Sequence, residues 1–179
     1  MTDPAHDKDL LRRIGTGDRA AMREFYTSHQ RGLTAFARAR GMDAATAADV
    51  VQDTMLDVWR SAGRYRGDAA AKTWLFTIAH NKIVDRVRKN ARVQYVDEVP
   101  DAIDETPDPE AITVSVSEAG RLRACLDRLK EAHKTVMRLA FYEDLSYDEI
   151  AEIEGVPNGT IKTRVFHAKK LLLRCLGTR

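Results

Sequence analysis

The chain has 179 residues, of which 44% are hydrophobic and 31% charged, and its formal net charge is +2. This length allows one domain or two small ones, and the composition is that of a soluble globular protein rather than a fibrous or disordered one. No apolar run approaches the roughly 20 residues that a membrane span needs, and the first residues lack the basic and apolar stretches of a signal peptide. We therefore expect a cytoplasmic protein with no membrane contact of its own.

The near-neutral total hides two basic blocks that are separated by an acidic one. Residues 60–92 carry nine basic and two acidic side chains, a net charge of +7, and residues 158–179 carry six basic side chains and no acid. Between these blocks, residues 97–118 hold eight acids and no base. Basic residues gathered in this way are typical of surfaces that bind nucleic acid.

Residues 93–116 contain three prolines and many acids but no sustained helical period, which predicts a flexible acidic linker. The linker divides the chain into two small domains, residues 1–92 and 117–179. No stretch alternates apolar and polar residues as a strand would, so we expect an all-α fold in which amphipathic helices pack together. In chain order, the predicted helices are 19–40 (capped by Asp18 and ended by Gly41), 44–60, 70–89, one that carries the apolar stripe Leu122, Cys125, Leu126 and Leu129, 132–142, and two more after residue 145.

The only two cysteines are Cys125 and Cys175, and they form no CxxC pair and no Cys/His cluster at metal-ligand spacing. This pattern predicts neither a zinc site nor a disulfide. Both cysteines fall at helical apolar positions, so we expect buried, inert thiols.

The last two predicted helices have the pattern of a helix-turn-helix. Ser146 and Glu149 form a capping box at the start of the first, Gly155 and Pro157 break the chain, and Asn158 can cap the second. On a helical wheel the second helix buries Ile161, Val165, Ala168 and Leu172 and turns hydroxyls, an imidazole and cations outward. Such a face suits the major groove of DNA, where short polar side chains reach base edges and cations bind phosphates. The alternative is an ordinary helical hairpin with a solvated basic face, but the cap, the tight turn and the acid-free second helix occur together and favour DNA binding.

Four stretches give the chain a family resemblance: DVVQDTMLDVW (residues 49–59), YRGD (65–68) leading to TWLFTIAHN (73–81), LSYDEIA (145–151) and GVPNGTIKTR (155–164). Their order and spacing resemble the extracytoplasmic-function class of RNA polymerase sigma factors in its two-domain form. The likeness covers most of the chain except the linker and the extreme ends. It implies three partners: core RNA polymerase, promoter DNA and a cognate anti-sigma factor. The sequence has no Gly-rich phosphate loop, no metal constellation and no nucleophile elbow, so we expect a protein that is not an enzyme and has no catalytic residue, cofactor or metal.

The resemblance implies that the helix containing residues 49–59 docks on the clamp helices of the largest polymerase subunit. The residues expected to make this contact are Asp49, Gln52, Asp53 and Leu56. Leu56 is an apolar residue on a polar face, as a partner contact requires. From the residues alone, a solvated acidic face or a metal site at Asp49, Asp53 and Asp57 remains open, although no histidine accompanies those acids.

The resemblance assigns recognition of the melted minus-10 promoter element to the loop after residue 64 and the helix that follows it. The residues expected to do so are Tyr65, Arg66, Gly67, Asp68, Trp74, Asn81, Asp85 and Arg88. An aromatic ring beside hydrogen-bonding groups and a cation can hold single-stranded DNA by stacking and charge. Trp74 could equally be a core residue, His80 is expected to be structural, and Val87 is expected in the core.

The resemblance makes the second helix of the helix-turn-helix the reader of the minus-35 element. The residues expected to contact it are Thr160, Lys162, Thr163, Arg164, Phe166, His167 and Lys170. Many family members have arginine where His167 stands, and arginine is the common bidentate reader of guanine, so the preferred promoter sequence stays open. Two other functions also stay open: a free-standing regulator that does not enter polymerase, and a sigma-like decoy that sequesters an anti-sigma factor.

Overall fold

The computed structural model describes residues 3–94 and 118–177, and within these ranges every regular element is a helix. The predicted all-α fold is confirmed, whereas the predicted linker lies almost entirely outside the described residues. No helix in the described ranges is long and apolar enough to cross a membrane. The elements are α1 (Pro4–Ile14), α2 (Arg19–Ala39), α3 (Ala44–Ser61), the short 3₁₀ helix η1 (Ala62–Arg64), α4 (Ala71–Gln94), α5 (Glu118–Asp127), α6 (Glu131–Phe141), α7 (Tyr147–Glu154) and α8 (Asn158–Leu176).

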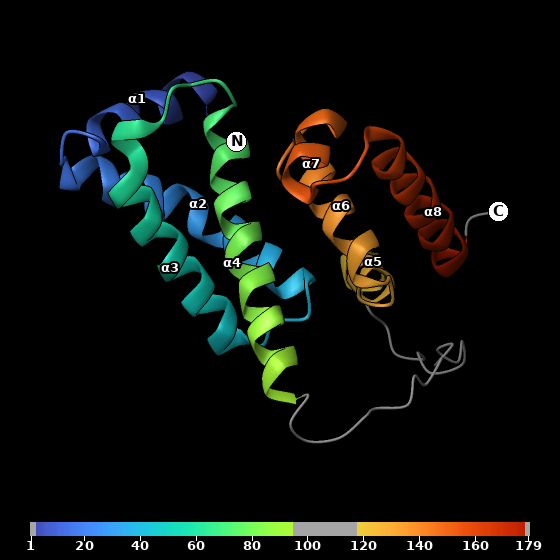
Figure 1. Ribbon diagram of the computed structural model, residues 1–179. Helices are drawn as coiled ribbons and strands as arrows, with labels where there is room; N and C mark the ends of the chain where they lie inside the picture. The colour runs from blue at the N-terminus through green and yellow to red at the C-terminus, as the bar shows by residue number, and fades with distance from the viewer. Residues whose placement is uncertain (1–2, 95–117, 178–179) are drawn as a thin grey trace.

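Helices α1–α4 pack around one apolar core that forms the N-terminal domain (Figure 1). Phe36 and Phe76 meet edge to face at its centre, with ring centroids 5.2 Å apart. Asp18 caps α2 by accepting hydrogen bonds from the amides of Ala20 and Ala21, as predicted. Gly41 follows α2 with a φ of +77°, a backbone conformation that favours glycine.

The N-terminal domain differs from the sequence prediction at two places. Helix α1 was not predicted, yet it buries Leu10, Leu11 and Ile14 in the core. Val87 was expected in the core but is 50% exposed. It lies about two turns beyond His80, the α4 residue that contacts the last residue of α7, so it lies past the end of α7.

Helices α5–α8 form the C-terminal domain, in which α8 packs against the other three. The Ser146–Glu149 capping box begins α7 as predicted, and Gly155 ends this helix with a φ of +64°. Ile161, Val165, Ala168 and Leu172 of α8 are all buried, as the wheel predicted. The predicted cap of α8 is wrong: the helix begins at Asn158 itself after Pro157, and the Asn158 amide hydrogen-bonds the carboxylate of Asp148 instead.

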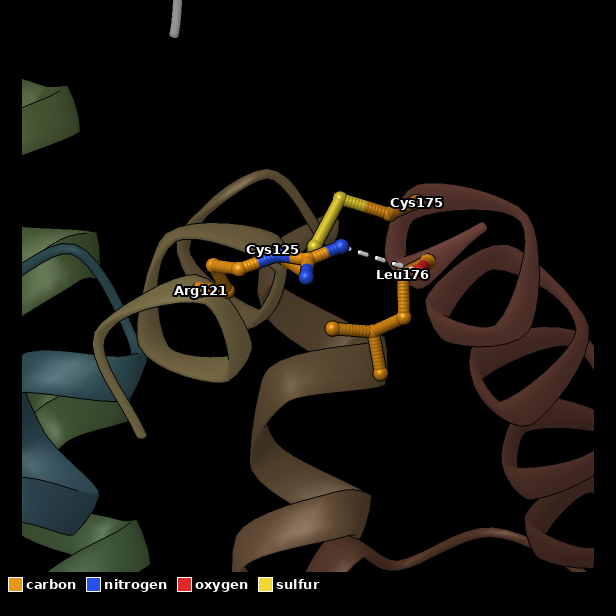
Figure 2. Close-up of a disulfide and its surroundings, with 4 residues drawn as sticks. All are labelled: Arg121, Cys125, Cys175 and Leu176. Carbon is orange, nitrogen blue, oxygen red and sulfur yellow. Dashed lines mark hydrogen bonds between the residues drawn. A yellow bond between two sulfur atoms is a disulfide. The ribbon is translucent and has the colours of Figure 1, made fainter. Parts of the chain in front are cut away.

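A disulfide joins Cys125 of α5 to Cys175 of α8, so the prediction of two inert thiols is wrong (Figure 2). The cysteines are 50 residues apart in sequence, but their Cα atoms lie 5.8 Å apart, within the usual range for this bond. Beside the bridge, the Arg121 guanidinium donates a hydrogen bond to the carbonyl of Leu176, 3.2 Å away. Leu122, which was placed on the same apolar stripe as Cys125, is 37% exposed.

The two domains are in contact, with α7 beside α4 and α6 beside α2 (Figure 1). The Lys72 ammonium lies 3.2 Å from the carboxylate of Glu143 and also donates to its carbonyl. The Thr73 hydroxyl donates to Glu149 at 2.8 Å. Gly32 of α2 permits this approach, because a Cβ at its position would lie 2.8 Å from a carboxylate oxygen of Glu143.

A buried carboxylate, Glu154 at the end of α7, is the centre of a second set of contacts between the domains. Its side chain is 8% exposed and is ion-paired with Arg40, the C-cap residue that follows α2. Arg40 also donates a hydrogen bond of 2.9 Å to His80, which lies 3.7 Å from Glu154. Arg164 of α8 approaches the same carboxylate to 3.5 Å. Burial alone would raise the pKa of Glu154, but His80 and the two arginines outweigh burial and lower it.

Candidate nucleic-acid and polymerase interfaces

The four residues predicted to contact core polymerase share one face of α3. Asp49, Gln52 and Leu56 are exposed, and Leu56 is 43% accessible despite its apolar side chain. Asp53 is half-buried. The opposite side of α3 packs on the core, so the four predicted contact residues face outward. The buried residues of that side include Val50, Val51, Met55 and Val58.

The acids of this face are ion-paired with α4. Arg86 lies 3.3 Å from Asp49 and 2.9 Å from Asp53, and the hydrogen bond to Asp53 is the main reason that the pKa of Arg86 is raised. Lys82 contacts Asp57 at 2.5 Å. These carboxylates therefore act as charge partners for α4 while their outer sides stay accessible.

The loop before α4 places a tyrosine against a tryptophan. The Tyr65 and Trp74 rings lie 5.2 Å apart, and the Tyr65 hydroxyl donates to the carbonyl of Ala69 at 2.6 Å. Burial, with a smaller contribution from Asp68, raises the pKa of Tyr65, so the phenol keeps the proton that this hydrogen bond needs. Trp74 is half-buried: one part packs on the core and another lines the surface.

Trp74 borders a hollow of about 400 Å³ between α3 and α4. Ile78 completes the apolar part of its lining, and Arg60 and Arg64 supply two cations. Asp57 lines the hollow as well and lies 3.9 Å from Arg60. An aromatic edge with two cations at one hollow suits a base that is taken out of the helical stack together with its phosphate. Among the other residues predicted to contact the minus-10 element, Gly67 is half-buried. The rest are exposed, namely Arg66, Asp68, Asn81, Asp85 and Arg88.

Five of the seven residues predicted to contact the minus-35 element are exposed. Lys162, Thr163, His167 and Lys170 are exposed, and Phe166 is 64% accessible. Thr160 is half-buried. Arg164 is half-buried too, because its ion pair with Glu154 directs it toward the domain interface.

Comparisons with known proteins decide the family. The Sigma-70 region 2 family matches residues 25–93, and the Sigma-70 region 4 family matches residues 119–172. The ECF RNA polymerase sigma factor SigK of Mycolicibacterium vanbaalenii is 30% identical over 94% of this chain and 88% of its own length. The ECF sigma factor RpoE of Cereibacter sphaeroides is 33% identical over 92% of this chain and 93% of its own length.

The chain belongs to the extracytoplasmic-function (ECF) family of RNA polymerase sigma factors. Proteins of this family are transcription initiation factors, not enzymes. Among solved structures, the sigma factor RpoE of Bartonella quintana, determined with the anti-sigma factor NepR, matches this ECF factor with a TM-score of 0.66 and 25% identity, over 87% of this chain and 96% of that one.

The structure adds surface residues of this ECF factor that the sequence reasoning did not assign to a site. Trp59 is 37% exposed and follows Gln52 and Leu56 at helical spacing, so it extends the apolar part of the α3 face. Arg60 and Arg64 were counted in a basic block, but their place beside Trp74 was not predicted. An apolar residue on an otherwise polar helix face was the one available signal for Trp59.

Proposed function

We propose that this ECF factor binds core RNA polymerase in the cytoplasm and directs transcription from promoters that it reads with both domains. The observation that carries the proposal is α8: an acid-free helix whose apolar side is buried and whose opposite side presents Thr163, His167 and Lys170. Thr163 and His167 would contact base edges of the minus-35 element, and Lys170 would contact phosphate.

The N-terminal domain would supply the other two contacts. The α3 face around Leu56 would dock on the clamp helices of the largest polymerase subunit. The hollow at Trp74 would take a base of the melted minus-10 strand, with stacking and two arginines offsetting the few kcal/mol that base flipping costs.

A cognate anti-sigma factor would control this activity. The support is the Bartonella quintana sigma factor, which was determined in complex with one. The contact between the two domains in this structure provides a compact form that such a partner can bind.

Transcription with purified components tests the proposal. The full chain is mixed with bacterial core polymerase and a pool of genomic promoter fragments, and discrete transcripts are expected. An Asp49→Ala/Gln52→Ala/Asp53→Ala variant should lose both core binding and transcripts. A matched control, Asp9→Ala/Glu24→Ala, removes two acids from α1 and α2 and should keep both activities.

Two other functions give different results. A free-standing regulator would bind a specific duplex tightly without core enzyme, and its transcripts would not depend on the α3 acids. A decoy would bind an anti-sigma factor but neither polymerase nor DNA. Either result would refute the proposal.

A further inference from the structure

We propose that Lys8, a residue of α1, binds a phosphate of the melted DNA strand beside the loop of residues 65–68. This inference deepens the proposed function and rests on it for the identity of the nucleic acid. The Sigma-70 region 2 match begins at residue 25, so α1 lies before it. None of the residues assigned to the minus-10 element lies on α1, so Lys8 would be an additional contact of that site.

Helix α1 lies against the segment that joins α3 to α4 (Figure 1). After its last turn, the backbones of Gly15 and Gly63 are in direct contact, because a Cβ at Gly15 would lie 2.8 Å from the Cα of Gly63. Gly63 belongs to η1, and Tyr65 follows that short helix directly. The start of the loop therefore rests on the end of α1.

The backbone of α1 at Lys8 is fixed by its neighbours. Asp7, the residue before it, is buried and lies 3.0 Å from the ring of His29 on α2. Leu10 and Leu11, which follow in the same turn, are fully buried in the core. Lys8 itself is exposed, so its side chain extends from an anchored backbone toward the surface.

The ammonium of Lys8 lies over Gly67. A Cβ built on Gly67 would be 3.1 Å from the Nζ of Lys8 and 3.2 Å from its Cε. Gly67 also has a φ of +80°, a backbone conformation that favours glycine. A side chain at this position would push the ammonium aside, so Gly67 leaves the space that brings the cation to the loop.

The charge of Lys8 is not neutralised by the acids beside it in the sequence. Asp7 is occupied by His29, and Asp9 is paired with Arg12 at 2.7 Å. Lys8 forms no ion pair with any residue in the part of the chain that the structure describes. Its ammonium is therefore available to an anionic ligand at the loop.

Lys8 adds a cation to those that already surround the loop. Arg64 lines the hollow at the aromatic edge, and Arg66 is exposed on the loop itself. Asp68 is the single acid of the loop. Cations from α1, η1 and the loop thus lie where the melted strand is expected, and cations on the phosphates together with aromatic rings under the bases are what holds single-stranded DNA.

The distance from the hollow suits a phosphate contact. Gly67 follows Tyr65 by two residues, so their Cα atoms are at most about 7.6 Å apart. The Tyr65 ring lies 5.2 Å from that of Trp74, which borders the hollow. A base that enters the hollow leaves its sugar and phosphates outside, on the side of the loop. Lysine binds phosphate as a point charge and reads no base edge, so this contact would strengthen every promoter alike.

Binding of a single strand by the holoenzyme tests the proposal. The probe is a 12-base oligonucleotide with the minus-10 sequence of a promoter mapped in the transcription assay, and its affinity is measured by fluorescence anisotropy. Lys8→Met removes the charge but keeps a long side chain. It should weaken binding about fivefold and reduce the salt slope by about 0.7, the value for one phosphate of a single strand. Lys8→Arg should stay within twofold of the wild type.

A matched variant separates a local contact from attraction to net charge. Arg23→Met also removes one exposed cation, from α2, and it should change the affinity less than twofold. Core polymerase binding should be the same in both variants, because neither residue lies on the α3 face. Equal losses of strand binding in the two variants would overturn the proposal, and so would unchanged strand binding by Lys8→Met.

Neutral methylphosphonate linkages locate the contact. Each phosphate of the probe is replaced in turn, and the wild-type holoenzyme should lose affinity at several positions. In Lys8→Met the loss next to the base in the hollow should disappear, since the cation that met this phosphate is gone, and the other losses should persist. If Lys8 only stiffened the loop, for example through Asp68, every methylphosphonate loss would keep its wild-type size, which would overturn the phosphate contact.

The outcomes distinguish this inference from the proposed function. If the wild type transcribes and Lys8→Met binds the strand normally, the phosphate contact is refuted and the sigma-factor function stands. A chain that never supports transcription with core polymerase would refute both. Disappearance of one methylphosphonate effect in Lys8→Met, with core binding intact, supports the assignment of Lys8 to the minus-10 site.

Discussion

Reduction of the Cys125–Cys175 disulfide should destabilise the C-terminal domain and leave the N-terminal domain unchanged. The bridge closes a loop of 50 residues, which contains α6, α7 and most of α8. A closed loop of this size restricts the unfolded chain and stabilises the fold by about 4 kcal/mol, between roughly 3 kcal/mol for 15 residues and 4.7 kcal/mol for 100. A domain of about 60 residues has a total free energy of unfolding of roughly 3–9 kcal/mol, so this contribution is a large part of it.

The two domains can be followed separately because both tryptophans, Trp59 and Trp74, lie in the N-terminal domain. Urea unfolding of the full chain is measured by far-ultraviolet circular dichroism for both domains and by tryptophan fluorescence for the N-terminal one. With an m-value of about 1–2 kcal/mol/M, dithiothreitol should lower the midpoint of the C-terminal transition by roughly 2–4 M. The fluorescence midpoint should stay in place.

The matched control is Cys125→Ser/Cys175→Ser, whose C-terminal transition should lie near that of the reduced protein and ignore the reductant. Thiol titration before and after treatment establishes that the bridge was present and then opened. A C-terminal midpoint that moves by less than 0.5 M on complete reduction would refute the loop-closure argument.

Three further predictions concern single side chains. Asp7→Ala should cost about 1–3 kcal/mol of unfolding free energy in the fluorescence transition, because it leaves the buried His29 without the carboxylate 3.0 Å away. The same loss in the control Asp9→Ala, which removes a half-buried carboxylate from the same helix, would contradict this. The pKa of Glu154 is lowered when the two domains are in contact. The contribution of Glu154 to that contact is therefore fully present above the usual glutamate pKa of 4.5, and it is lost as the pH falls through the lowered pKa. Energy transfer between dyes on the two domains should therefore fall on acidification in the wild type and be much less pH-dependent in Glu154→Gln. Lys170→Ala should weaken all promoters alike and reduce the salt slope of DNA binding by about one unit, whereas His167→Ala should change the preferred minus-35 sequence in a promoter-selection assay.

Local signals in the sequence predicted most of the helices correctly. Asp18, the Ser146–Glu149 box and Gly155 act within a few residues of themselves, so their effects can be read without knowing the fold. Helix α1 was not predicted, because its pattern depends on a residue that is distant in the sequence. Its buried stripe begins with Asp7, a charged residue that is tolerated in the core only because His29, 22 residues away, pairs with it.

The contacts that join distant segments could not be predicted. The spacing of Cys125 within its stripe is the same whether its thiol is free or bridged, because the partner lies on another helix. The same holds for Arg86, which meets Asp49 and Asp53 only after α3 and α4 pack. For the candidate sites, the helical period predicted which side chains are exposed, but not that Arg164 turns toward Glu154.

The arrangement of the domains bears directly on how the proposed function is switched. Elements at minus 10 and minus 35 are 25 base pairs apart, or roughly 85 Å along a duplex that rises 3.4 Å per base pair. In this structure α4 touches α7, and α8, which packs on α7, is only about 28 Å long at 1.5 Å per residue. The DNA-contacting surfaces of two domains that touch each other cannot span that distance. Promoter binding therefore requires the contacts between the domains at Glu143, Glu149 and Glu154 to break. Any partner that favours those contacts therefore opposes transcription without covering a single DNA-reading residue.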